Sequence, residues 1–160
     1  MEETEPFLLA EKPMKTLIAL FVGCTVWIQE PLFQAGRTGT LRLKITQLRN
    51  DRGKVNLSLY QSKDGYPSDP KKAFKKIKAE IREGICEITF VDLPRGEYAI
   101  SLMHDENENE KMDTGFLGIP KEGYGASNDA KVTFGPPKYE DARFVLKGNP
   151  ETLRIKMRYL

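Results

Sequence analysis

From Thr40 onward, apolar and polar residues alternate along the chain with a period of two. The alternation is clearest in residues 41–46 and 55–59, where Leu, Ile or Val occupies every second position. Because successive side chains of a β-strand point to opposite faces, this pattern predicts antiparallel strands that are buried on one face only. It therefore favours an all-β fold over a fold built mainly from helices.

Turn-forming residues separate these runs. Arg49–Gly53 contains Asn, Asp and Gly, which tolerate the positive φ angles of tight turns, so a hairpin is predicted between the first two strands. Ser62–Pro70 is expected to be a loop, and the lysine-rich Pro70–Lys76 one helical turn. The other strand-like runs are 77–82, 85–91, 97–104, 142–146 and 152–159. Seven short strands with little helix predict a seven-stranded antiparallel β-sandwich of the immunoglobulin-like kind.

The first 35 residues have a different character. Lys15 precedes an apolar run of 12 residues, Leu17–Ile28, which is too short for a bilayer-spanning helix of roughly 20 residues. The run predicts the apolar helix of a secretory signal peptide over 1–35, with cleavage after Ala35 and a secreted or periplasmic mature chain, 36–160, that forms one domain. Because the residues before Met14 carry four glutamates, Met14 is a candidate start. The alternatives are a buried helix, an N-terminal membrane anchor, or lipidation at Cys24, whose preceding residues loosely match a bacterial lipobox.

Composition removes several classes of function. The formal net charge of +2 argues against a dedicated nucleic-acid binder. One His and two distant Cys residues lack the ligand spacing of a zinc cluster, and the mature chain keeps only Cys86, so no internal disulfide is expected. Cys86 shares a predicted strand face with Ile88 and Phe90, which indicates a small buried apolar residue and not a reactive thiol.

One connection is far longer than the others. Residues 105–141 form a stretch of 37 residues rich in Gly, Pro, Asn and Asp. Such long connections in compact domains are usually functional or disordered. The aromatic residues Phe116, Tyr124, Phe134 and Tyr139 predict that the stretch folds back onto the sandwich.

The same region carries a family resemblance. Residues 91–127 (VDLPRGEYAISLMHDENENEKMDTGFLGIPKEGYGAS) and 134–137 (FGPP), together with Leu48–Asn50 and Asp64–Pro67, strongly resemble the bacterial family called domain of unknown function 2141. The resemblance covers about residues 40–159 and implies a secreted or envelope protein with a transthyretin-like, or prealbumin-like, β-sandwich. It implies no activity. Residues 90–98 are also similar to a strand-turn-strand of collagen-binding-B-like and carboxypeptidase-regulatory domains.

Residues 105–113 are the strongest candidate for a metal site. Oxygen-bearing side chains recur at every second position, and calcium is bound by six to eight oxygens. The predicted ligands are Asp105, Asn107, Asn109, the Lys111 carbonyl and Asp113. The resembling family commonly has Gly at the positions of Glu108 and Glu110. Glu110 is the sixth residue of the loop counted from Asp105, and a calcium loop turns sharply at its sixth position, where Gly is favoured. A solvated acidic turn is an equally good interpretation. Glu106, Glu108 and Glu110 act as substitute ligands if calcium binds, and face water if it does not.

Two further groups of residues are candidates for binding or catalysis. His104 precedes Asp105, but neighbours on a strand point to opposite faces, so His104 is expected to anchor the long loop and not to act as a base. The glycine-rich segment Gly115–Gly125 lacks the spacing of a nucleotide fingerprint, and its Phe116, Lys121 and Tyr124 are candidate contacts for sugars or peptides. Five clustered lysines either face solvent or attract the protein weakly to an anionic membrane surface: Lys71, Lys72, Lys75, Lys76 and Lys78.

These observations favour a non-enzymatic secreted or envelope module that binds a partner protein or polysaccharide through the long loop, with calcium as a candidate for ordering that loop. The first alternative is a hydrolase-type enzyme that uses His104 and the acidic loop. The second is a purely structural envelope protein.

Overall fold

The computed structural model describes residues 38–131 and 135–160. The predictions for residues 1–35, including the signal peptide and Cys24, lie outside this part of the chain. The strands are β1 (Thr38–Thr46), β2 (Lys54–Tyr60), β3 (Lys75–Ala79), β4 (Cys86–Pro94), β5 (Gly96–Asp105), β6 (Gly123–Ala126), β7 (Phe144–Leu146) and β8 (Glu151–Lys156). The helical turns are η1 (Pro70–Lys72), η2 (Phe116–Gly118), η3 (Ser127–Asp129) and α1 (Tyr139–Ala142). No helix among the described residues is long and apolar enough to cross a membrane.

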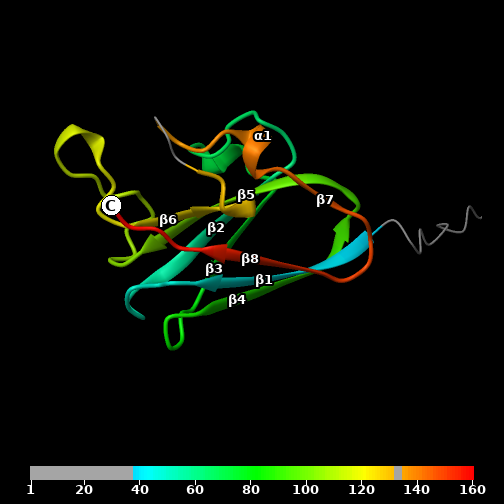
Figure 1. Ribbon diagram of the computed structural model, residues 1–160, viewed down its shortest axis with the longest axis horizontal. Coiled ribbons are helices and arrows are strands. Elements are labelled where there is room, and N and C mark those ends of the chain that lie inside the picture. The colour runs from blue at the N-terminus through cyan, green and yellow to red at the C-terminus, as the bar shows by residue number, and fades with distance from the viewer. Residues whose placement is uncertain (1–37, 132–134) are drawn as a thin grey trace, which may run out of the picture. The chain divides into compact units, whose positions relative to one another are not determined.

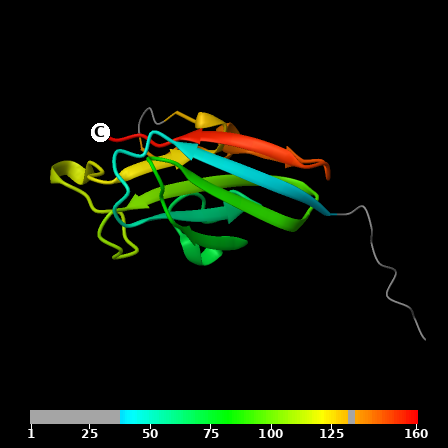
Figure 2. The same ribbon diagram turned by 90° about the horizontal axis from the view of Figure 1, so that it is seen from below.

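The strands form two sheets packed face to face (Figure 1 and Figure 2). One sheet has the order β4-β1-β8, and the other has the order β3-β2-β5-β6, with β7 also paired to β5. The predicted all-β class is thus confirmed. The described residues contain eight strands and not seven, because β6 lies inside the stretch that was expected to be a connection. The sheets are not wholly antiparallel either, since β1 and β8 pair in parallel.

The predicted hairpin between the first two strands is wrong. β1 pairs with β4 and β8, whereas β2 pairs with β3 and β5 in the other sheet. Seven residues, 47–53, separate the two strands, enough to cross from one sheet to the other. Asp51 fixes this crossing, because its carboxylate accepts the backbone N–H groups of Glu83 (2.8 Å) and Gly84 (2.8 Å). Both apolar rows therefore face each other across the core.

The alternating residues fill the space between the sheets. The apolar residues of β1, β2 and β5 that point inward, such as Leu41, Leu57 and Ile100, are at most 2% exposed. Cys86 is 1% exposed and free, as the sequence predicts, and burial raises the pKa of its thiol to about 11. A smaller apolar cluster lies under α1 and includes Tyr60 and Tyr139.

The C-terminal segment joins the two sheets. After β8 the chain crosses to β6, where Tyr124 and Arg158 exchange two backbone hydrogen bonds of 2.9 Å. One side of the sandwich is thereby closed. The short helix predicted within Pro70–Lys76 is present as η1, and Asp69 caps it by accepting the Lys71 N–H.

Candidate functional site

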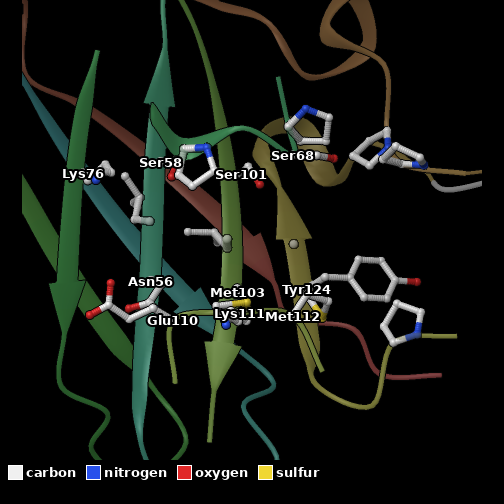
Figure 3. A pocket seen from close by; sticks show the side chains of 18 of the residues that line it. Asn56, Ser58, Ser68, Lys76, Ser101, Met103, Glu110, Lys111, Met112 and Tyr124 are labelled. Atoms are coloured by element: carbon white, nitrogen blue, oxygen red, sulfur yellow. The ribbon is translucent and has the colours of Figure 1, made fainter. Parts of the chain in front are cut away.

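The outer face of the β3-β2-β5-β6 sheet is hollowed into a groove of about 870 Å³, here called the sheet groove (Figure 3). Its floor follows from strand alternation: Leu57 and Leu102 face the core, so their neighbours on β2 and β5 face outward. The outward residues on the floor are Asn56, Ser58, Ser101 and Met103. The walls come from loops and include Pro67, Pro70, Met112, Leu117, Ile119, Pro120, Pro136 and Pro137.

The floor carries a polar strip between apolar walls. Strand register places Ser58 opposite Ser101 and also opposite Lys76 on β3, and Figure 3 shows these three residues side by side. Lys76 makes no salt bridge within the described residues, whereas its neighbour Lys78 pairs with Glu110 at 2.5 Å. The groove therefore offers hydroxyl groups and two cations without a salt bridge among the described residues, Lys76 and Lys111, beside a largely apolar surface.

The acidic loop, residues 105–113, curls back on itself through hydrogen bonds of its own side chains. Asp105, which is 2% exposed, accepts the backbone N–H groups of Asn109 (3.0 Å) and Glu110 (2.8 Å). Asp113 accepts the side-chain amides of Asn107 (2.7 Å) and Asn109 (3.1 Å). Four of the five predicted ligand residues thus come together through side-chain contacts.

Glu110, which stands where a calcium loop favours Gly, nevertheless adopts the sharp turn. Glu110 has a φ angle of 62°, so this residue adopts the left-handed turn that Gly favours, as Glu108 does with a φ of 58°. The Lys111 N–H donates to the side-chain oxygen of Asn109 at 2.8 Å. However, N–H groups already occupy the carboxylate oxygens of Asp105 and Asp113. Among the described residues, no three His, Cys, Asp or Glu side chains are grouped as metal ligands.

A buried glutamate that the sequence did not single out ties the loop together. Glu122 is 4% exposed, and its two oxygens accept the N–H groups of Glu106 (3.0 Å) and Asp113 (3.1 Å). The loop between them is therefore closed at its neck. No motif marks Glu122, because its partners are backbone groups.

Glu106 anchors the same neck from the other side. Its carboxylate accepts hydrogen bonds from Arg49 Nε (2.7 Å), Asn50 (3.0 Å) and Arg52 (2.9 Å). Burial acts to raise the pKa of Glu106, but the hydrogen bonds from Asn50 and Arg49 and the Arg49 charge outweigh it, and the pKa is lowered. Glu106 is thus neither a free ligand nor a residue facing water.

His104 is held away from the groove. It is fully buried; its Nε2 lies 2.8 Å from the Arg52 carbonyl and its Nδ1 lies 2.6 Å from the Tyr159 hydroxyl. A carbonyl only accepts, so Nε2 donates to the Arg52 carbonyl, and Nδ1 of the neutral tautomer accepts from the Tyr159 hydroxyl. His104 therefore anchors the 49–53 crossing and the C-terminal segment, and not the long loop as expected. As predicted, it does not bond to Asp105, which binds Asn56 instead.

The three predicted binding residues of the glycine-rich segment are placed differently. Tyr124 is half-buried on β6 and lines the sheet groove. Phe116 is 85% exposed at the loop tip, beside Leu117, which is 82% exposed and has a φ of 60°. The exposed Lys121 lies at the neck, where its N–H donates to the Asp113 carbonyl at 2.8 Å. Phe134 falls outside the described residues.

The five clustered lysines do not act alike. Lys72 pairs with Asp64 at 2.7 Å, and Lys78 pairs with Glu110. Lys76 lines the sheet groove, while Lys71 and Lys75 are exposed. The five lysines therefore do not form one positive surface: some lie in a loop and others at the rim of the sheet groove.

Comparison with known proteins gives the family. The model of the family described as an uncharacterized protein conserved in bacteria (DUF2141) matches residues 43–154, well over half of the chain. The chain belongs to this family. No curated protein matches its sequence.

Two solved structures of a pilus-presented adhesin, Spy0125 (Cpa), show some likeness to this DUF2141 member. One has 17% identity and a TM-score of 0.29, and a cysteine-to-alanine variant of it has 16% identity and a TM-score of 0.28. Each match covers 77% of this chain and 28% of the adhesin chain. The likeness carries no argument about function.

Proposed function

We propose that this DUF2141 protein is a non-enzymatic binding module of the bacterial envelope, and that the sheet groove holds its ligand. The groove itself supports the proposal most directly. Its volume of about 870 Å³ lies in the range of roughly 300–1,000 Å³ that is typical of ligand sites. A regular sheet provides a rigid floor, and the long loop, closed by Glu122, provides a wall.

The lining favours an extended segment of a partner protein. Prolines and methionines give flat or adaptable apolar contacts, and Tyr124 provides a ring with a polar end. Lys76 is suited to an acidic group on the ligand, and the hydroxyls of Ser58 and Ser101 are suited to its backbone or to sugar hydroxyls. A polysaccharide stacked on Tyr124 is the alternative ligand.

The test fills the groove and measures binding. Peptides are selected from a random displayed library against the full chain, and their Kd values are then measured by fluorescence anisotropy. Ser101→Trp should weaken binding by at least about tenfold, because the indole occupies the floor. Thr89→Trp, on an exposed position of the other sheet, serves as the control and should leave the Kd unchanged. If selected peptides ignore Ser101→Trp, or if neither peptides nor an oligosaccharide array gives a binder, the proposal fails.

The geometry gives less support to the alternatives. A hydrolase that uses His104 would need this ring in a pocket, but both of its nitrogens are engaged and it lines neither described pocket. A purely structural envelope protein would have no use for a groove of this size.

Calcium is a second part of the proposal. The curl of residues 105–113 and the left-handed conformation of Glu110 support a calcium ion held by Asp105, Asn107, Asn109, the Lys111 carbonyl and Asp113. The ion would have to displace the amide hydrogen bonds to Asp113. We therefore expect weak binding, of about 10⁻⁴–10⁻³ M, the range of extracellular calcium modules.

A further inference from the structure

The outer face of the other sheet, β4-β1-β8, carries an array of positive charges. Strand alternation sends the apolar residues of β1 and β8, such as Leu43 and Ile155, into the core and their neighbours outward. The outward residues on the three strands are Arg42, Lys44, Thr46, Glu87, Thr89, Val91, Thr152, Arg154 and Lys156. Four of them are cations and one, Glu87, is an acid; Asp92, which has a left-handed φ of 53° farther along β4, is the other exposed acid on these three strands.

The strand register brings the cations close together. Lys44 lies opposite Arg154 in the parallel β1-β8 pair, with Arg42 two positions before Lys44 and Lys156 two positions after Arg154. Neighbouring strands are about 4.8 Å apart, and residues two apart on a strand are separated by about 6.7 Å. Like charges directly opposite each other destabilise a sheet, so this arrangement has a cost that a bound anion would relieve.

Few acids within the described residues compensate this array. Glu87 pairs with Lys44 at 3.2 Å, and both side chains are well exposed. Arg42, Arg154 and Lys156 make no salt bridge in the described part of the chain, whose ion pairs all involve other cations. Three positive side chains thus remain free on one flat face.

The array is a narrow band and not a broad plane. Glu87 on β4 bounds it on one side. On the other side lies Asp129, whose carboxylate accepts the Lys156 backbone N–H at 2.9 Å. A band about two strands wide fits a linear polyanion better than a plane of lipid headgroups. Thr46 and Thr152 add hydroxyls between the charges, which suits sugars.

We propose that this band, on β1 and β8, binds an acidic polysaccharide whose carboxylate or sulfate groups contact Arg42, Arg154 and Lys156. The site is independent of the sheet groove, which lies on the other sheet. The two proposals therefore succeed or fail separately.

The test compares two triple variants of the full chain that lose the same charge. Arg42→Gln with Arg154→Gln and Lys156→Gln removes the band, whereas Lys63→Gln with Lys71→Gln and Lys138→Gln removes three exposed lysines that make no salt bridge in the described residues. Binding to immobilised polygalacturonate and to dextran sulfate is measured at low and high salt, with neutral dextran as the reference. Losing three exposed charge contacts should weaken binding about tenfold, and the lysine control should stay within about twofold.

A charge-preserving variant separates charge from folding. Arg42→Lys with Arg154→Lys should keep most of the affinity, and all variants should melt close to the parent. Equal losses in both triple variants would mean that net charge alone drives binding and would overturn the proposal. Tighter binding to phosphatidylglycerol vesicles or to nucleic acid than to polygalacturonate, or no binding at low salt, would overturn it as well.

Discussion

Replacing Glu122 with Gln should release the neck of the long loop. The buried carboxylate accepts two N–H groups, from Glu106 and Asp113, so both of its oxygens must be acceptors. Gln has nearly the same shape but presents an NH₂ group to one of these donors. One charge-assisted hydrogen bond is lost, and one buried N–H is left without a partner. Together these changes should lower the free energy of unfolding by about 2–3 kcal/mol.

Urea denaturation and thermal melting measure this loss directly. For a domain of this size, 2–3 kcal/mol corresponds to a fall in Tm of about 10 °C. Glu140→Gln is a matched control, because it removes an exposed carboxylate of the same type and should change stability by less than about 0.5 kcal/mol. Hydrogen exchange should also quicken at the amides of Glu106 and Asp113. The reasoning is refuted if Glu122→Gln is as stable as the control, or if stability falls while those two amides keep their protection.

Three further predictions follow from the described geometry. Because the folded-state pKa of Glu106 lies below its usual value of 4.5, its contribution to stability is complete above that pH and is lost as the pH falls through the folded-state pKa. In urea denaturation at pH 7, 4.5 and 3, the free energy of unfolding should therefore fall less with acid for Glu106→Gln than for the parent. Equal falls in the two proteins would contradict this. Cys86, buried and with its pKa raised to about 11, should react with iodoacetamide at pH 8 only after unfolding, and rapid labelling of the native protein would show that the thiol is accessible. Millimolar calcium should raise the Tm of chelator-stripped protein and not that of Asp113→Ala, and no shift at 10 mM would remove the calcium proposal.

The all-β fold class was predictable, because it rests on the local alternation of apolar and polar residues. The order of the strands in the two sheets was not predictable. The apolar rows of β1 and β2 are visible in the sequence, but the same rows pack equally well across a core or side by side. The parallel pairing of β1 with β8 joins opposite ends of the domain, which no local pattern reveals. β6 has two glycines in four residues, Gly123–Ala126, and so lacks the alternation that marks the other strands.

The candidate site was predictable only in part, for the same reason. The curl of residues 105–113 follows from short-range bonds between side chains and nearby backbone, and the sequence spacing indicates it. Glu122 is bound by backbone groups, while His104 is bound by the Arg52 carbonyl and by Tyr159, far along the chain, and none of these partners has a sequence signature. The sheet groove itself exists because loops far apart in sequence meet over one sheet face.

The pairing of β1 with β8 has a consequence for the order in which the domain folds. Leu41 lies beside Glu151, so their pairing closes a loop of 110 residues. A chain that emerges from its N-terminus, from a ribosome or a translocation channel, exposes β1 first but supplies β8 last. Long-range pairings of this kind form slowly, because the entropy of loop closure opposes them before any contact is gained. β4 can pair with one edge of β1 much earlier, but the other edge stays unpaired until β8 is free, and until then it is an open strand edge that a chaperone can cover.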